Sequence, residues 1–323
     1  MSGEFRPREQ PKVKGLARFA SKQVDPADVI DLAADHAAAV EGRTLFPTTV
    51  VEPRHSPRLF VSGKNNPKLG AAVRFGPRAG WPIFHLTLEE RATCPRSCVM
   101  WRGCYGNAMH MARRHRAGGD LERLIIVEIG LLARDHPDGF LVRLHTLGDF
   151  YSRAYVALWA QLLKAHPALH VFGYTARTEM DDDAESRAIA ADIYRLSNAR
   201  WDRFAIRFSR PGGGPQGAYV VDEVPNRPDV VLCPAQTDKT AACATCGLCW
   251  APAFQGKAIA FLRHGMTRRP AAVEPHMAPL PEADPQPVAR DETPPDRALL
   301  NLAAAGDKIA IRALARRVLK SGD

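Results

Sequence analysis

The chain has 323 residues, of which 46% are hydrophobic and 24% charged, a composition that excludes an intrinsically disordered protein and allows a substantial core. Its net charge of +9 and pI of about 9.4 favour an anionic partner, with nucleic acid or a nucleotide expected first. A solvated basic surface without a specific partner is the alternative. No segment reads as a membrane span or export signal, so we expect a cytoplasmic protein with no membrane partner.

The composition divides the chain into four regions. Residues 1–55 form a basic N-terminal extension with one alanine-rich helical segment, and residues 56–268 have the pattern of an α/β core. Residues 269–296 are rich in proline and poor in apolar side chains, which predicts an extended linker. Residues 297–323 return to helical periodicity with a basic face, and we expect a C-terminal helix there.

Within the core, short segments rich in β-branched and aromatic residues alternate with segments of helical periodicity. This order predicts an α/β fold in which a parallel sheet forms a partial or full (βα) barrel, with a Cys-rich metal-binding extension. Strands are predicted at residues 82–88, 140–146, 169–175, 203–209, 218–221, 229–232 and 258–264. Helices are predicted at residues 105–117, 120–135, 152–165 and 181–197.

Seven cysteines fall into two groups, which is the strongest chemical signal in the chain. The first cysteine group is Cys94, Cys98 and Cys104, spaced C-x3-C-x5-C. Thiols stay reduced in the cytoplasm, so clustered cysteines indicate metal before disulfides. Three thiolates on a 4Fe-4S cluster leave one iron open to a small chelating molecule such as S-adenosylmethionine. Isolated buried thiols are the alternative for this group.

The second cysteine group is Cys233, Cys243, Cys246 and Cys249. Its C-x2-C-x2-C run with a remote Cys-Pro pair is typical of a four-iron cluster, although the pair lies upstream of the run. Structural zinc is the alternative, with His264 as a possible fourth ligand.

The strand predicted at 140–146 carries polar residues and stops at Gly148-Asp149. The cysteines of the first group follow the preceding strand, and ligands collect at the carboxyl ends of parallel strands. We therefore expect the two strand ends to form one site. Arg143 and His145 are predicted to share a strand face, with His145 and Asp149 as candidate catalytic residues.

Several further polar residues lie near the ends of predicted strands. They suggest a phosphate-bearing substrate, although any one of them could be a structural ion pair or a buried hydrogen-bonded group. The candidate substrate-binding residues are Arg143, Tyr174, Arg177, Arg207 and Arg210.

Four motifs in sequence, "SGKNNPKLG", "TCPRSC…GCYG", "RLHTLGDFYS" and "FGYTART", resemble the phage gene-product-88-like family over roughly residues 58 to 265. That family is itself similar to radical-SAM-like phage proteins. The resemblance implies that Leu147-Gly148-Asp149 takes the place of the Gly-Gly-Glu-like turn that binds the methionine amino group. Gly148 and Asp149 would then be cofactor-binding residues. The C-x3-C-x5-C spacing is longer than the usual C-x3-C-x2-C of radical SAM enzymes.

The leading hypothesis is therefore an iron–sulfur, radical-SAM-like enzyme. The first alternative is an enzyme resembling the tRNA-guanine transglycosylases, in which Cys243, Cys246, Cys249 and His264 hold zinc and Asp149 is the nucleophile. The second is a non-catalytic, metal-stabilised nucleic-acid-binding protein.

Overall fold

The computed structural model describes residues 31–66, 68–210, 213–221, 223–237 and 239–262. The linker at 269–296, the C-terminal helix at 297–323 and His264 lie outside the described residues, as does the first part of the N-terminal extension.

The core is an eight-stranded sheet in the order β2-β3-β5-β6-β7-β8-β10-β9. Every neighbouring pair is parallel except β2 with β3. The predicted strands are therefore present and mostly parallel, with ends shifted by a few residues. Their bounds are β2 (Val61–Ser62), β3 (Ile83–His85), β5 (Phe140–Leu144), β6 (Leu169–Thr175), β7 (Phe204–Ser209), β8 (Gly217–Val221), β9 (Val230–Leu232) and β10 (Ala258–Leu262).

The sheet is open, so the expectation of a full barrel is wrong. Barrel closure requires the two edge strands to pair with each other. Within the described ranges β2 pairs only with β3, and β9 pairs only with β10. Strand and helix periodicity indicates that a parallel sheet forms, but the closure of such a sheet depends on strand tilt and register, which periodicity does not encode.

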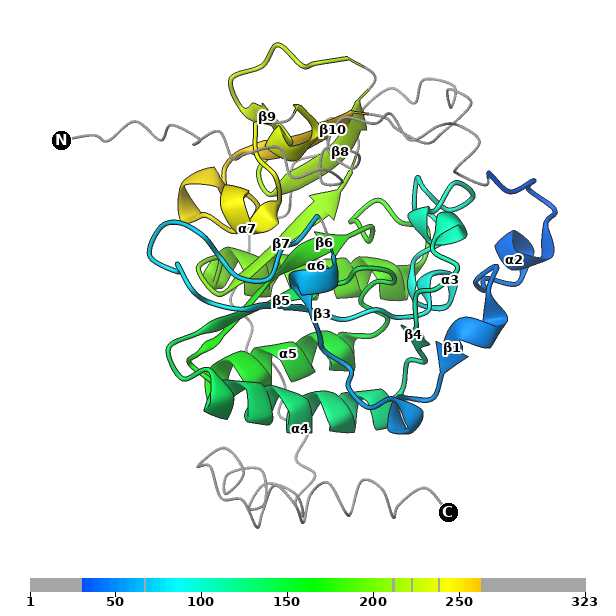
Figure 1. The fold of residues 1–323 in the computed structure, drawn as a ribbon. Helices are drawn as coiled ribbons and strands as arrows, with labels where there is room; N and C mark the ends of the chain where they lie inside the picture. Colours follow the sequence, from blue (N-terminus) through cyan, green and yellow to red (C-terminus); the bar gives the residue numbers. More distant parts are fainter. Residues whose placement is uncertain (1–30, 67, 211–212, 222, 238, 263–323) are drawn as a thin grey trace.

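Three long helices cover one face of the sheet: α4 (Gly119–Asp135), α5 (Arg153–Ala165) and α6 (Ala184–Ala199). Figure 1 shows α4 and α5 lying together along this side. The Ser152 hydroxyl caps α5 by accepting a hydrogen bond from the Tyr155 amide at 3.1 Å. Both α4 and α5 end before His-Pro, as the sequence predicted. Leucine, isoleucine and aromatic side chains fill the space between these helices and the sheet.

The opposite face, which we call the inner face, packs against the chain that carries the second cysteine group. Leu141 and Phe172 point to this side and contact Leu69, Ala244 and Trp250 in one buried cluster. Helix α7 (Cys243–Cys246) therefore lies over the inner face, on the other side of the sheet from α4 and α5 (Figure 1). This packing brings cysteines that follow β9 back over the centre of the sheet.

One helix prediction is wrong, and another is met by only a short helix within the described residues. Residues 105–117 form a short 3-10 helix, η5 (Tyr105–Ala108), and then strand β4 (Arg114–His115), which pairs with β1 (Val50–Val51). The helical pattern was overridden because Arg114 is fully buried and bonded to Glu90. In the alanine-rich N-terminal segment, the described part holds only α2 (Ala37–Val40). The remaining short elements are α3 (Glu90–Thr93), η2 (Pro47–Thr49), η3 (Pro53–His55), η4 (Gly63–Asn65), η6 (Pro234–Thr237) and η7 (Pro252–Phe254).

Helix α4 contains a long apolar stretch, yet none of the helices in the described ranges is long and apolar enough to cross a membrane. Glu128 interrupts that stretch for a structural reason. Its carboxylate accepts hydrogen bonds from the backbone N–H groups of Leu59, at 2.8 Å, and Phe60, at 3.1 Å. The segment that leads into β2 is thereby attached to α4.

We expect Glu128→Ala to lower the free energy of unfolding by about 2 kcal/mol, because it leaves two backbone N–H groups near the core without an acceptor. Urea unfolding of the full chain, followed by circular dichroism, measures this change. Asp135→Ala is the matched control, since Asp135 ends the same helix in an exposed ion pair with Arg134. An equal loss in both variants would contradict the proposed role of Glu128.

Candidate functional site

The first cysteine group lies in the segment that follows β3 and α3. All three thiols are free and partly buried. Burial raises the pKa of Cys94, and the nearby Asp149, Cys98 and Cys104 raise it further when ionised. Burial also raises the pKa of Cys98 to about 12, with a contribution from Cys104. Asp149 also raises the pKa of Cys98, so its charge acts on both Cys94 and Cys98.

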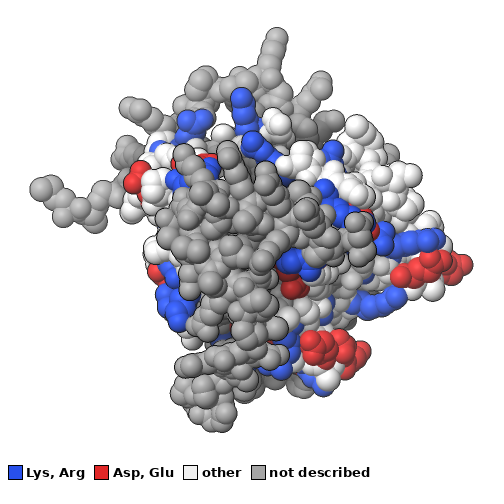
Figure 2. Space-filling view, turned by 90° about the horizontal axis from the view of Figure 1, so that it is seen from below, with Lys and Arg blue, Asp and Glu red and all other residues white. Residues whose placement is uncertain are grey.

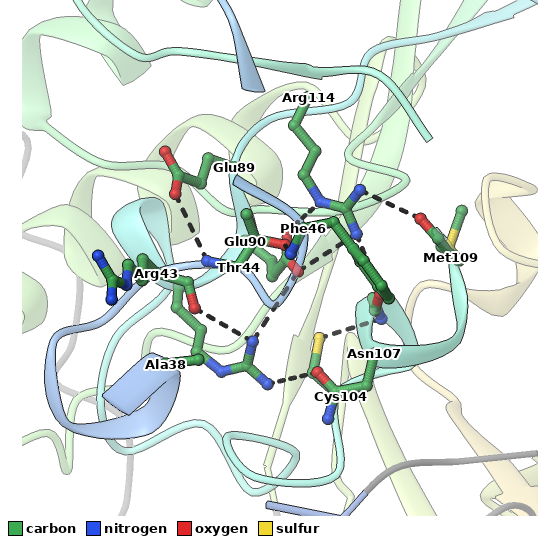
Figure 3. Close-up of polar contacts among 12 residues, drawn as sticks. Ala38, Arg43, Thr44, Phe46, Glu89, Glu90, Cys104, Asn107, Met109 and Arg114 are labelled. Atoms are coloured by element: carbon green, nitrogen blue, oxygen red, sulfur yellow. Dashed lines mark hydrogen bonds and ion pairs between the residues drawn. The ribbon is translucent and has the colours of Figure 1, made fainter. Parts of the chain in front are cut away.

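A buried ion pair supports this cysteine segment from inside (Figure 3). Arg114 Nε donates to a Glu90 carboxylate oxygen at 2.8 Å, and both side chains are almost fully buried. The same guanidinium donates to the carbonyl oxygens of Gly106, at 3.0 Å, and Met109, at 3.1 Å. The Gly106 amide donates to Cys104 Sγ at 3.4 Å. Arg114 thus holds the chain just after Cys104 in a defined path.

The Gly148 turn lies against the residue that precedes Cys94. Gly148 has φ +86°, and a Cβ atom there would lie 2.6 Å from Leu88 Cβ and 2.7 Å from Thr93 Oγ1. The next amide, that of Asp149, donates to Thr93 Oγ1 at 3.1 Å. Glycine is required here both for its backbone conformation and for the close approach. The turn after β5 and the first cysteine group are therefore in direct contact.

The Asp149 carboxylate joins the carboxyl ends of β5 and β6. It accepts hydrogen bonds from the Phe150 amide at 2.7 Å, Thr175 Oγ1 at 2.8 Å and the Ala176 amide at 2.6 Å. Burial raises its pKa to about 6, while Arg177 and these hydrogen bonds act in the opposite direction. A carboxylate has about four acceptor positions, so three bonds leave one position on Oδ2.

Arg177 completes the same buried network. Its guanidinium donates to the carbonyl oxygen of Thr93 at 2.9 Å, to the Ser186 hydroxyl at 2.8 Å and to the carbonyl oxygen of Phe150. These bonds attach the residue before Cys94 to β5, β6 and α6. Arg177 was predicted to bind substrate, but in the structure its guanidinium donates hydrogen bonds to groups of the protein itself.

The second cysteine group lies over the inner face. Ionised Cys249 raises the pKa of Cys233, Cys243 and Cys246, after the larger effect of burial on each. Cys233 and Cys246 likewise raise the pKa of Cys243, and Cys233 raises that of Cys246. Every pair among the four thiols therefore interacts. Cys233, which precedes η6, is thus near Cys243, Cys246 and Cys249, which follow it.

Two sets of backbone contacts fix this group. The Cys243 amide donates to the Lys68 carbonyl oxygen, and the Ala244 amide to that of Leu69, both at 2.8 Å. On the other side, the fully buried Arg207 donates to four carbonyl oxygens of the chain from Leu248 to Lys257, at 2.8–3.3 Å. Arg207 was predicted to bind substrate, but its donors are used to hold the chain around Cys249.

Among the residues that the structure describes, no three His, Cys, Asp or Glu side chains form a group that would hold one metal ion. Tyr174 contacts the second cysteine group, since its hydroxyl lies 2.9 Å from Cys249 Sγ.

Arg143 and His145 do not share a face, contrary to expectation. Strand β5 ends at Leu144, so the two-residue alternation does not reach His145. The Arg143 guanidinium lies over the Tyr174 ring on the inner face, 4.6 Å from its centroid. The His145 ring instead packs against Phe150 and Tyr155 on the helix side, with Nε2 3.0 Å from the Tyr155 hydroxyl. Burial and Arg143 lower the pKa of His145 to about 3, so it is neutral.

The last predicted substrate residue, Arg210, forms an ion pair with Glu179 at 3.0 Å. Arg177, Arg207 and Arg210 therefore all have partners within the protein, whereas Arg143 has none of that kind in the described part of the chain. On the face in Figure 2, several of the coloured Lys and Arg groups lie beside Asp and Glu groups.

Sequence reasoning missed Thr93, Glu90 and Arg114, which hold the first cysteine segment, and Lys68, which lies beside the second group. Glu90 and Arg114 give no local signal, because their pairing joins residues 24 positions apart. Lys68 stands in the quoted motif "SGKNNPKLG", so that motif contained a signal that was not used.

We expect Gly148→Ala to lower the free energy of unfolding by about 1–3 kcal/mol, because Ala is disfavoured at this φ and its Cβ meets Leu88 and Thr93. Gly256→Ala is the control, since nothing lies within 4 Å of a Cβ at that position. The urea-unfolding midpoint of the full chain measures both effects. If the two variants unfolded alike, the close approach at Gly148 would be refuted.

Comparison with known proteins identifies the family. Residues 60–252 match the family described as Gene product 88, which is more than half of the chain and includes both cysteine groups and the Gly148-Asp149 turn. The Gene 88 protein of Mycobacterium phage L5 is 30% identical over 131 residues, which are 34% of this chain and 50% of that protein. The match thus spans half of that relative's length, and no solved structure gives a significant match. The chain belongs to the Gene product 88 family.

Proposed function

We propose that this protein is an iron–sulfur, radical-SAM-like enzyme whose reactive centre is held by Cys94, Cys98 and Cys104. The observation that carries the proposal is the contact between the first cysteine group and the Asp149 turn at the ends of β3 and β5. Three thiols beside one carboxylate form a donor set for a cluster and for an amine.

The residues present fit a 4Fe-4S cluster with S-adenosylmethionine. Such a cluster, when bound by three thiolates, supplies one-electron chemistry to a molecule on its open iron. Asp149 would orient that molecule, because one acceptor position on its Oδ2 is not used by Phe150, Thr175 or Ala176. Gly148 allows this carboxylate to sit directly behind the cysteine segment.

For the second cysteine group we propose a second 4Fe-4S cluster. Four thiols near enough to raise one another's pKa, with the C-x2-C-x2-C run and the remote Cys-Pro pair, form the ligand type of a four-iron centre. Structural zinc remains the alternative for this group.

The transglycosylase-like alternative would use the same carboxylate, because Asp149 would have to attack its substrate through the one Oδ2 position that its three hydrogen bonds leave. His145, the other candidate catalytic residue, lies on the helix side of the sheet among aromatic rings, and the proposal does not use it. The non-catalytic nucleic-acid-binding hypothesis rests on the net charge of +9 alone.

We expect protein purified without oxygen to contain about eight iron and eight sulfide per chain, with the absorption of 4Fe-4S clusters. Cys246→Ser, in the second group, is expected to retain about four iron, and Cys98→Ser to lose the iron held by the first group. Metal analysis and sulfide determination on the full chain measure this.

The position of Cys98 and Cys246 in separate groups makes each variant the control for the other. One zinc per chain without iron would overturn the iron–sulfur proposal. About four iron in the parent protein, unchanged in Cys98→Ser, would leave only the second group loaded and would overturn the radical-SAM-like assignment.

A further inference from the structure

Tyr174 touches a cysteine of the second group through its side chain. Its hydroxyl oxygen lies 2.9 Å from Cys249 Sγ, within hydrogen-bond distance. Tyr174 lies near the carboxyl end of β6 and points to the inner face, as Phe172 does two residues earlier. A strand residue at the centre of the sheet is thus in direct contact with one of the proposed cluster ligands.

The main chain at Cys249 is held in place independently of this contact. Arg207 pairs with Tyr174 on the adjacent strand β7, and its Nε donates to the Cys249 carbonyl oxygen at 3.2 Å. The next side chain, Trp250, is buried against Phe172, with ring centroids 4.5 Å apart. Cys249 therefore keeps its position without the Tyr174 hydroxyl, and the hydroxyl contact acts on the sulfur alone.

The Tyr174 ring is itself fixed by its neighbours. The Arg143 guanidinium carbon lies 4.6 Å from the ring centroid, and the Phe261 ring meets it edge-on at 5.9 Å. Strand β6 is paired on both sides, with β5 and with β7, so its backbone is also held. A hydroxyl that is already aimed at the sulfur loses little conformational entropy when it forms the hydrogen bond.

Metal binding decides the direction of this hydrogen bond. Between a hydroxyl and a free thiol, either atom can be the donor. A cysteine that binds metal is a thiolate without a proton, so the Tyr174 hydroxyl has to donate. Hydrogen bonds to charged acceptors are stronger than neutral ones, and an electron added to a cluster makes its sulfur ligands more negative. Such a hydrogen bond therefore favours the reduced state.

We propose that Tyr174 donates a hydrogen bond to the metal-bound sulfur of Cys249 and thereby raises the reduction potential of the second 4Fe-4S cluster. The inference rests on the proposed function, because it needs a cluster in the second group. On reduction one electron enters the cluster, no covalent bond forms or breaks, and the proton stays on the tyrosine oxygen. Tyr174, which the sequence predicted to bind substrate, is then a positioning residue that acts through Cys249.

The test is a redox titration of the full chain with dithionite, purified without oxygen and followed by electron paramagnetic resonance. A Cys98→Ser background, expected to hold only the second cluster, gives a single signal. We expect Tyr174→Phe to keep its iron, because the hydroxyl is not a ligand. Its equilibrium constant for one-electron reduction should fall about tenfold, a shift of about 59 mV to lower potential.

Tyr194→Phe is the matched control and should keep the parent potential. Tyr194 lies in α6 and packs against Phe208 on the helix side of the sheet, away from the second cysteine group. Equal potentials in Tyr174→Phe and Tyr194→Phe, with the iron retained, would overturn the inference. Loss of the second group's iron in Tyr174→Phe alone would also overturn it, because the hydroxyl would then be needed to hold the cluster.

Iron content measured on the same samples separates this inference from the proposed function. About eight iron in the parent with an unchanged potential in Tyr174→Phe would overturn the inference and leave the radical-SAM-like assignment standing. About four iron, unchanged in Cys98→Ser, with a lowered potential in Tyr174→Phe would do the reverse. Zinc without iron would overturn both.

Discussion

The site depends on one buried carboxylate. Asp149 accepts hydrogen bonds from Phe150, Thr175 and Ala176, and its own amide donates to Thr93, so it ties the ends of β5 and β6 to the residue before Cys94. Burial of a carboxylate is costly unless its oxygens are bonded, which explains why three donors and the nearby Arg177 surround it. A movement of one strand end would therefore strain the hydrogen bonds to the other. The segment that carries the first cysteine group is held in place by the same bonds.

The second cysteine group is positioned by the hydrogen bonds of a buried arginine. Arg207 extends from β7 toward the chain after Cys246 and donates hydrogen bonds to the carbonyl oxygens of Leu248, Cys249, Phe254 and Lys257. The chain around α7 has little regular structure, so its backbone groups need such partners. An arginine that looks functional by its place at a strand end is thus required for folding. On the same face, the Nε atom of Arg143 has no hydrogen-bond partner among the described residues.

Two residues add contacts around the cysteine groups. Tyr174 has its hydroxyl against Cys249 and its ring under Arg143. Lys68 contacts Cys243 through its backbone, and its Nζ lies near the ring of Tyr105, which follows Cys104.

The sequence by itself determined most of the strands and the long helices of the core. Cysteine spacing grouped the seven thiols correctly in space, Ser152 and the His-Pro pairs marked helix ends, and Gly148-Asp149 marked a strand-end site. These signals are local, because a helix cap, a turn or a closely spaced pair of cysteines involves residues only a few positions apart. Only the tertiary structure decided that the sheet stays open, that residues 105–117 are not a helix, that His145 turns away from Arg143, and that Arg177 and Arg207 bind backbone. Each of these outcomes depends on partners far along the chain, as with Glu90 and Arg114, and no pattern within one segment encodes which buried charge finds which partner.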